Sequence, residues 1–221
     1  MRILAALLIL SAAVPAAAQP PSGTLEAMRR DFPIDHQALA AGLAGKTPDE
    51  ARRSAYAGID RFLRSRRDSI LGAPGAALAA IEARQGAMLR ALVRQDVRLC
   101  ATLGDRGFFS SEAAAGAAPP GLDDYGAALI AAAKAGAGTG RAATLATKDD
   151  FNAWLTAVER IEPGIPVRRM LFDRELRARS SQDHLCRGAA AMHEAVATLA
   201  PEPRERVART LLSSVIGTPA P

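Results

Sequence analysis

The fold is decided by residues 47–104, TPDEARRSAYAGIDRFLRSRRDSILGAPGAALAAIEARQGAMLRALVRQDVRLCATLG. Thr47, Pro48 and Glu50 form a helix start signal, because a Thr cap, an early Pro and a Glu at the third position suit the free N-terminal amides. Apolar residues then recur at intervals of three and four on both sides of the turn GAPG, as amphipathic helices require. These are Ala55, Ile59, Phe62, Leu63, Ile70, Leu78, Ile81, Leu89, Leu92, Leu99 and Leu103. The stretch therefore predicts a long helical hairpin over residues 48–103.

The rest of the chain also predicts helices. Strand signals are nearly absent, since aromatic residues make up only 4% of the chain and β-branched runs do not occur. Pro, Gly and capping Ser or Thr delimit further helical segments at 24–31, 35–44, 120–135, 148–161, 166–179, 181–200 and 202–216. We expect an all-α protein, an irregular helical bundle of about six to eight helices built around the hairpin.

The same signals divide the chain into regions. They predict an N-terminal arm with short helices at 19–46 and a single helical domain at 47–216. Within this domain, the Gly/Ala-rich segment at 135–147 is interpreted as a flexible link. A tail follows at 217–221.

The first 18 residues, MRILAALLILSAAVPAAA, have the pattern of a secretory signal peptide. A single Arg2 precedes a short apolar run, and small residues follow Pro15. The apolar run is shorter than the roughly 20 residues that cross a bilayer. We expect cleavage near Ala18/Gln19, no transmembrane segment after cleavage, and a periplasmic or secreted protein.

Positive charge predominates, with a formal net charge of +5, and nearly all of it is arginine. Acidic residues are interspersed through most of the arginine-rich segments, so we expect no nucleic-acid partner. Arg90, Arg94 and Arg98 follow one another at intervals of four, without compensating acids in their own helix. Either acids from another element cover this row, or the row is a surface that binds an anion.

Two pairs of opposite charges fall opposite one another in the predicted hairpin. Folding it about residue 73 sets Arg52 level with Asp96, and Arg66 level with Glu82. All four lie on or near apolar helix faces. We interpret them as structural ion pairs that set the register of the two helices.

The stretch SQDHLCRGAAAMHEA, residues 181–195, places His184, Cys186 and His193 close together in sequence. On a helix, His184 points away from the face shared by Cys186 and His193, so the three cannot converge on one metal ion. The only other cysteine is Cys100, on the apolar face of its own helix. In an oxidising compartment, two such cysteines most simply form one disulfide, Cys100–Cys186.

Antiparallel packing at this disulfide places His193 about one turn from Asp96. These two residues are weak catalytic candidates, because Arg52 competes for the same carboxylate and a histidine on an apolar face is usually structural. Familiar hydrolase motifs do not occur. We expect a non-enzymatic binding or chaperone-like protein without cofactor or metal, whose partner is an envelope protein or an anionic envelope component. The alternative is a small-ligand-binding protein or enzyme with a pocket near Asp96 and His193.

Overall fold

The computed structural model describes residues 22–216 apart from 107, 110, 117 and 140–143. The expected signal peptide with its cleavage point, and the tail at 217–221, lie outside the described residues. The all-α prediction is confirmed, since the described residues form thirteen helices and no strand. In chain order these are α1 (Ser22–Asp31), α2 (Pro33–Leu43), α3 (Pro48–Ser65), α4 (Arg67–Leu71), α5 (Gly75–Gln95), α6 (Val97–Arg106), α7 (Ser111–Ala115), α8 (Leu122–Gly136), α9 (Lys148–Ile161), α10 (Val167–Phe172), α11 (Arg174–Arg179), α12 (Gln182–Val196) and α13 (Pro201–Val215).

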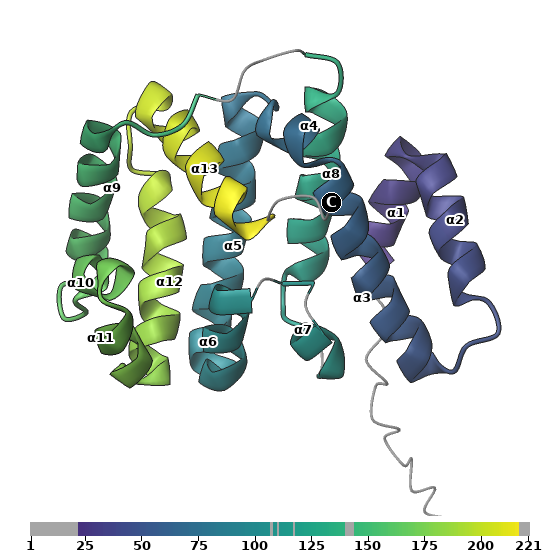
Figure 1. Ribbon diagram of the computed structural model, residues 1–221, viewed down its shortest axis with the longest axis horizontal. Coiled ribbons are helices and arrows are strands. Elements are labelled where there is room, and N and C mark those ends of the chain that lie inside the picture. Colours follow the sequence, from purple (N-terminus) through teal and green to yellow (C-terminus); the bar gives the residue numbers. More distant parts are fainter. Residues whose placement is uncertain (1–21, 107, 110, 117, 140–143, 217–221) are drawn as a thin grey trace, which may run out of the picture.

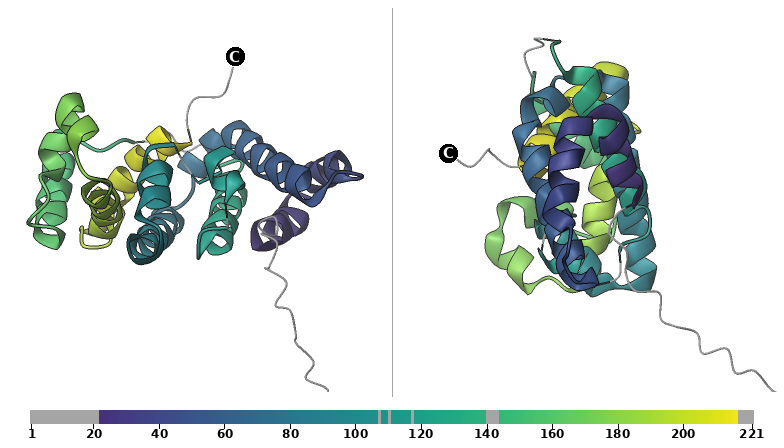
Figure 2. Two further views of the ribbon diagram at one scale, coloured as in Figure 1. Left: turned by 90° about the horizontal axis from the view of Figure 1, so that it is seen from below. Right: turned by 90° about the vertical axis from the view of Figure 1, so that its right-hand side faces the viewer.

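Five helices form a row across the molecule, in the order α9, α12, α5, α8 and α1 (Figure 1). Figure 2, seen from below, shows the same order, with the remaining helices packed around the row. Helix α5 occupies the middle and packs against α12 on one side and α8 on the other. This order brings segments far apart in the sequence side by side, and α12 contributes residues to most of the sites described below.

The two long helices predicted to form a hairpin share α8 as a partner and otherwise pack against different helices. Helix α3 packs against α2, α7 and α8, whereas α5 packs against α6, α8, α12 and α13. The local reason is a break at Arg66, where φ −104° and ψ 11° end α3 before the short helix α4. Helix α8 packs closely on α4, because Gly136 leaves room there: a Cβ on it would lie 1.8 Å from the carbonyl oxygen of Ser69.

The second predicted helix is also interrupted. Asp96 leaves helical geometry at φ −154° and ψ 87°, which ends α5 at Gln95. Its carboxylate accepts a hydrogen bond of 2.9 Å from the backbone N–H of Leu99 and so caps α6. An aspartate that helical periodicity placed inside an apolar face is therefore an exposed N-cap residue.

The predicted disulfide Cys100–Cys186 is confirmed and joins α6 to α12. The Cα atoms lie 5.3 Å apart, and both residues are fully buried. The bridge closes a loop with a sequence separation of 86 residues. On the chain-entropy model, a loop of this length stabilises the fold by roughly 4–5 kcal/mol.

The second half of the segment predicted as a flexible link is held by α13. The buried guanidinium of Arg209 donates to the carbonyl oxygens of Leu71 and Thr144, and the hydroxyl of Thr210 accepts from the backbone N–H of Ala146. Residues 140–143 of this segment lie outside the described residues. The hydrogen bonds place the start of α9 against α13.

None of the described helices is long and apolar enough to cross a membrane. Their apolar faces are directed into one continuous core, in which the aromatic rings of Tyr56, Phe108, Phe109 and Tyr125 lie between α3, α8 and the segment after α6. Burial raises the pKa of the Tyr56 hydroxyl to about 12 and raises that of Tyr125 further. Both phenols are therefore neutral at physiological pH.

Candidate functional site

A buried polar cluster joins the middle of α5 to α12. The imidazole of His193 lies between two side chains of α5, with Nδ1 2.5 Å from a carboxylate oxygen of Glu82 and Nε2 2.9 Å from the amide nitrogen of Gln85. These contacts fit an imidazole that donates from Nδ1 to the carboxylate and accepts from the amide at Nε2. All three residues are buried. Although Glu82 and His193 are titratable, they are buried and contact each other. We therefore interpret the cluster as a structural contact between α5 and α12.

The predicted constellation of Asp96 with His193 is corrected, because His193 meets Glu82 instead. Asp96 lies 14 positions after Glu82 at the exposed end of α5. At about 1.5 Å rise per helical residue, that separation is roughly 20 Å. The two weak catalytic candidates are therefore not brought together. Glu82 was not expected as the partner of His193, because the hairpin prediction pairs Glu82 with Arg66.

The two predicted ion pairs across the hairpin are corrected as well. Arg52 pairs with Asp49 of its own helix, at 3.2 Å. Arg66 pairs with Asp35 at 3.1 Å, and its guanidinium lies over the rings of two phenylalanines, Phe32 and Phe62. Both arginines thus have partners in the N-terminal part of the fold. The physical reason is that α3 and α5 do not face each other as the hairpin required.

The first member of the predicted anion-binding row is covered by acids from other elements. Arg90 forms a bidentate contact with Glu194, at 2.9 and 2.6 Å, and donates to Glu162 at 2.7 Å. Arg187 contacts the second oxygen of Glu162. Burial alone would raise the pKa of Glu162, but hydrogen bonds from Arg187 and Arg90 outweigh it and lower this pKa. The network is therefore an ionised set of charges that ties α5 and α12 to the residue after α9.

Arg94 and Arg98, the other two members of the row, are exposed. In the described part of the chain, neither guanidinium has an acidic partner. The structure therefore divides the row into one arginine that belongs to the fold and two that face solvent.

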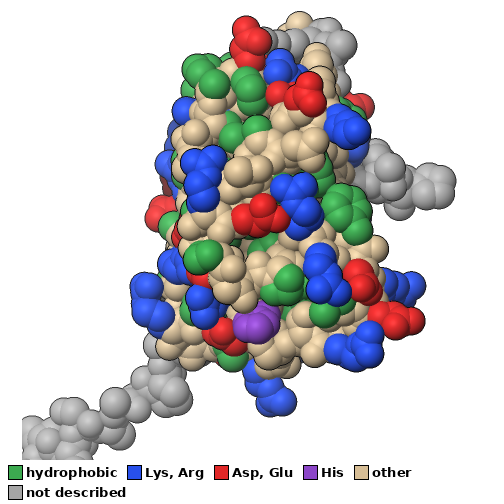
Figure 3. Space-filling view, turned by 90° about the vertical axis from the view of Figure 1, so that its left-hand side faces the viewer, with side chains coloured by type: hydrophobic (Ala, Val, Ile, Leu, Met, Phe, Trp, Pro, Cys, Tyr) green, Lys and Arg blue, Asp and Glu red, His purple; other side chains and the backbone are tan. Residues whose placement is uncertain are grey.

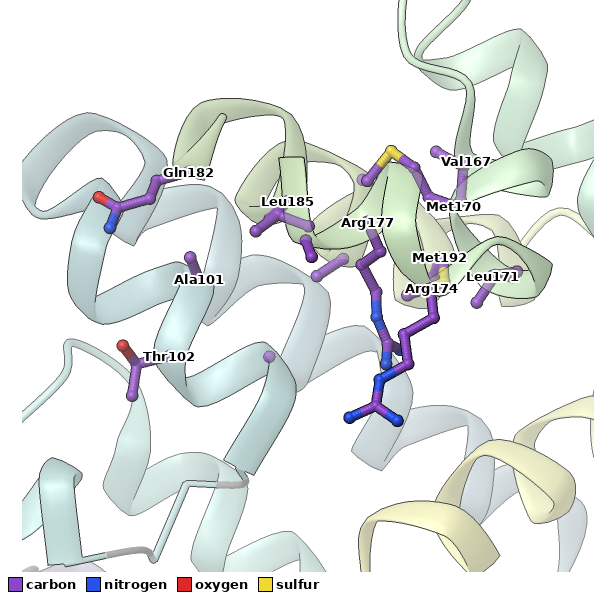
Figure 4. A pocket seen from close by; sticks show the side chains of 14 residues that line it. Ala101, Thr102, Val167, Met170, Leu171, Arg174, Arg177, Gln182, Leu185 and Met192 are labelled. Atoms are coloured by element: carbon purple, nitrogen blue, oxygen red, sulfur yellow. The ribbon is translucent and has the colours of Figure 1, made fainter. Parts of the chain in front are cut away.

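A groove with a volume of about 600 Å³ lies between α6, α10, α11 and α12. Larger apolar side chains from α10 and α12 line it: Val167, Met170, Leu171, Leu185 and Met192. Small residues on α6 and α12 form the remaining wall. Figure 4 shows Val167, Met170, Leu171 and Met192 gathered at one end, with Thr102 and Gln182 at the other. The groove is mostly apolar and combines residues from four helices, as small-molecule sites commonly do.

Among the described side chains that line the groove, the charged ones are two arginines of α11, Arg174 and Arg177. They lie three positions apart on one helix face, and Figure 4 shows both side chains extending in the same direction. Among the described residues, neither guanidinium contacts a carboxylate. The nearby Asp173 is engaged elsewhere, since its carboxylate accepts from the backbone N–H of Leu176 at 2.8 Å. The groove therefore combines an apolar wall with two positive charges that have no acidic partner.

The surface on this side of the molecule agrees with that composition. Figure 3 shows the face beside α9, on which basic side chains are spread among hydrophobic ones and fewer acidic ones. Phe172, the last residue of α10, is 73% exposed and adds to the apolar surface of this region. Neither Asp96 nor His193 lines the groove. The concave surface and the buried histidine cluster are therefore separate features.

The groove is not predictable from the sequence pattern, because that pattern predicts one helix over residues 166–179. The structure has two short helices that meet at Asp173, where φ −109° and ψ 97° break the helical path. Aspartate followed by a Glu two positions later is compatible with a helix start, and that signal was available. What the sequence did not contain was the change of direction that opens the space between α10, α11 and α12.

The described residues contain no group of three or more His, Cys, Asp or Glu side chains placed to hold a metal ion. The groove is therefore the candidate site. Comparison of the chain with protein-family models, with curated protein sequences and with solved structures finds no match, so the groove between α6, α10, α11 and α12 has to be interpreted from its own chemistry.

Proposed function

We propose that the protein is a non-enzymatic binding protein of the cell envelope that holds a partly apolar ligand in the groove between α6, α10, α11 and α12. The observation that carries the proposal is the groove itself, an open space of about 600 Å³ with apolar walls and two arginines that contact no carboxylate among the described residues. Spaces of this size accommodate small organic molecules. A monomeric protein that exposes such a surface needs a reason for leaving it uncovered.

Catalysis is less well supported than binding. A catalytic group has to reach its substrate, within hydrogen-bond distance or through one water molecule. The groups with acid–base chemistry, Glu82 and His193, are 0% and 6% exposed and face each other inside the interface between α5 and α12. The alternative of a pocket near Asp96 and His193 loses its support because those residues lie far apart along the fold.

An exported location is part of the proposal. The disulfide Cys100–Cys186 is compatible with an oxidising compartment such as the periplasm or the exterior. The apolar pattern of residues 1–18 supports export through a cleaved signal peptide. N-terminal sequencing of protein recovered from the envelope fraction should give Gln19 as the first residue. Recovery of intact Met1 in the membrane fraction would contradict this part of the proposal.

The groove is tested by filling it. Ala178 is exposed and lines the groove, so Ala178→Trp adds a bulky ring there without disturbing the core. We expect the affinity for an environment-sensitive naphthylamine dye to fall roughly tenfold, because the ring occupies apolar surface that the dye would bury. Ala153→Trp is the matched control, since Ala153 is exposed on α9 and does not line the groove. Equal dye binding by wild type and both variants would place the binding surface elsewhere.

A weaker contact with an anionic envelope component remains proposed for Arg94 and Arg98. Both side chains are exposed and neither has an acidic partner in the described residues. Replacing both with Gln should reduce retention on an anionic matrix and flatten its dependence on salt. Retention equal to that of wild type would remove this surface from the proposal.

A further inference from the structure

We infer that the ligand of the groove is a single-chain amphiphile with an anionic head group, such as a fatty acid or a lysophospholipid. Its chain lies against the apolar wall, and its head group is bound by Arg174 and Arg177. This inference rests on the proposed binding function and specifies the chemical class of the ligand.

The wall of the groove suits a narrow and flexible hydrocarbon chain. Its floor is the backbone of α12 at Gly188, where an added Cβ would already lie 3.3 Å from Cγ2 of Val167. Met170 and Met192 supply unbranched and polarisable side chains, which adjust to apolar ligands of different length. The apolar wall therefore accommodates hydrocarbon chains of different length.

The charged end of the site requires an anion. Arg174 and Arg177 are exposed and lie on one face of α11, where like charges three positions apart repel each other. None of the described side chains that line the groove is acidic. Two arginines in neighbouring elements do have acidic partners, Arg168 with Glu159 and Arg187 with Glu162. A bound carboxylate or phosphate would supply the missing acid, through hydrogen bonds that both guanidinium groups can donate.

A peptide fits the same groove less well than an amphiphile. An extended peptide carries a backbone N–H and C=O at each residue, and each of them needs a partner when it is buried. Two walls of the groove are the longer helices α6 and α12, whose central backbone groups are satisfied within each helix. Thr102 and Gln182 are the only uncharged polar side chains among the lining residues. A hydrocarbon chain carries no polar groups and therefore leaves none unpaired.

The inference is tested by comparing head groups at constant chain length. Isothermal titration calorimetry of the mature protein, below the micelle concentration of each compound, would use a long-chain fatty acid, the anionic lysophosphatidylglycerol, the corresponding long-chain alcohol and a long-chain trimethylammonium salt. We expect both anionic compounds to bind more tightly than the alcohol, and the cation to bind most weakly. Equal affinity for the fatty acid and the alcohol would overturn the inference. A preference between the two anionic compounds would identify the head group, since a carboxylate or a phosphate satisfies the same two arginines.

The two arginines are tested by a double replacement and a matched control. Arg174→Gln/Arg177→Gln should weaken fatty-acid binding roughly tenfold or more while leaving binding of the alcohol unchanged. Arg53→Gln/Arg61→Gln removes the same charge from exposed positions on α3, at the other end of the row of helices, and should leave both affinities unchanged. Unchanged fatty-acid binding by the first variant would overturn the role of these arginines.

The outcomes separate this inference from the proposed function. If the alcohol and the fatty acid bind equally, and Ala178→Trp weakens both, the groove is a binding site but the inferred head group is wrong. If none of the amphiphiles binds and Ala178→Trp leaves dye binding unchanged, the proposed function fails as well. If a hydrophobic acidic peptide binds to the groove and the amphiphiles do not, the ligand class is wrong.

Discussion

Two groups of arginines near α12 differ in whether carboxylates accompany them. Arg90 and Arg187 share the buried carboxylate of Glu162, and Glu194 completes the set. Arg174 and Arg177 line an apolar groove and contact no carboxylate among the described residues. The first arrangement ties helices together, and its charges are balanced inside the protein. The second leaves positive charge to be balanced by something else, which is why we assign ligand binding to it.

The largest effect is expected at the buried polar cluster, where the protein supplies both partners. His193→Leu should lower the free energy of unfolding by about 3–5 kcal/mol, because it leaves the buried carboxylate of Glu82 without its partner. Glu82→Leu/His193→Leu removes both polar groups and should cost far less. Urea unfolding followed by circular dichroism measures His193→Leu, the single replacement Glu82→Leu and the double variant. Additive effects of the single replacements would show that the two side chains do not act as a pair.

Replacing Arg90 should lower the free energy of unfolding less than replacing His193, because the Arg90 side chain is 29% exposed. We expect Arg90→Leu to lower the free energy of unfolding by about 2–3 kcal/mol, since Glu162 and Glu194 lose charge-assisted hydrogen bonds. Arg94→Leu, one turn later on the same helix, is the matched control and should change stability by less than about 0.5 kcal/mol. Similar losses in the two variants would contradict the distinction drawn between paired and unpaired arginines.

Arg206 is a third arginine with a carboxylate partner, Asp150, and this pair predicts that stability depends on pH. A hydrogen bond from Arg206 lowers the pKa of Asp150 below its usual range, and the N-cap contacts with Thr147 lower it further. Because the folded-state pKa is lower than the unfolded value of about 3.9, this carboxylate stabilises the protein above that pH and loses the effect as the pH falls below it. Asp150→Asn should cost about 1 kcal/mol at neutral pH, and the difference from wild type should shrink in acid. A difference that stays constant between pH 7 and strong acid, at roughly the same 1 kcal/mol, would contradict this assignment.

The smallest effect on stability is expected for the unbalanced pair. Arg174→Gln/Arg177→Gln should change the free energy of unfolding by less than about 0.5 kcal/mol, and relief of like-charge repulsion favours a slight gain. Thermal and urea unfolding of the ligand-free protein measure this effect. A loss of stability comparable with that of Arg90→Leu would mean that Arg174 and Arg177 stabilise the fold, which would contradict the distinction between the two groups of arginines.

Local signals in the sequence predicted the starting points of several helices, although the described residues form thirteen helices where six to eight were expected. The capping box at Thr47 and Glu50 is formed, and the helix predicted at 148–161 begins and ends at those residues. The disulfide was predictable because both cysteines lie on apolar faces and no other cysteine competes. The helix predictions depend on residues close together in sequence, and two cysteines can form only one intramolecular disulfide.

Partners of charged side chains were not predictable in the same way. Arg66, Asp96 and Asp173 all lie at breaks between helices, and each break changes which surfaces face one another. Once α8 rather than α3 packs beside α5, the matching heights of Arg52 and Asp96 lose their meaning. The groove depends on the break at Asp173, so neither its shape nor its unpaired arginines could be derived from helical periodicity alone.

Trp154 gives the molecule a built-in optical reporter. It is the only tryptophan of the chain, it is buried on α9, and its indole N–H donates a hydrogen bond of 2.8 Å to the carbonyl oxygen of Met192 on α12. The side chain of Met192 lines the groove. The fluorescence emission of Trp154 therefore reports on the contact between α9 and α12. A shift of α12 at Met192 changes the environment of the indole, so movement of that wall can be followed in the unlabelled protein by its own fluorescence.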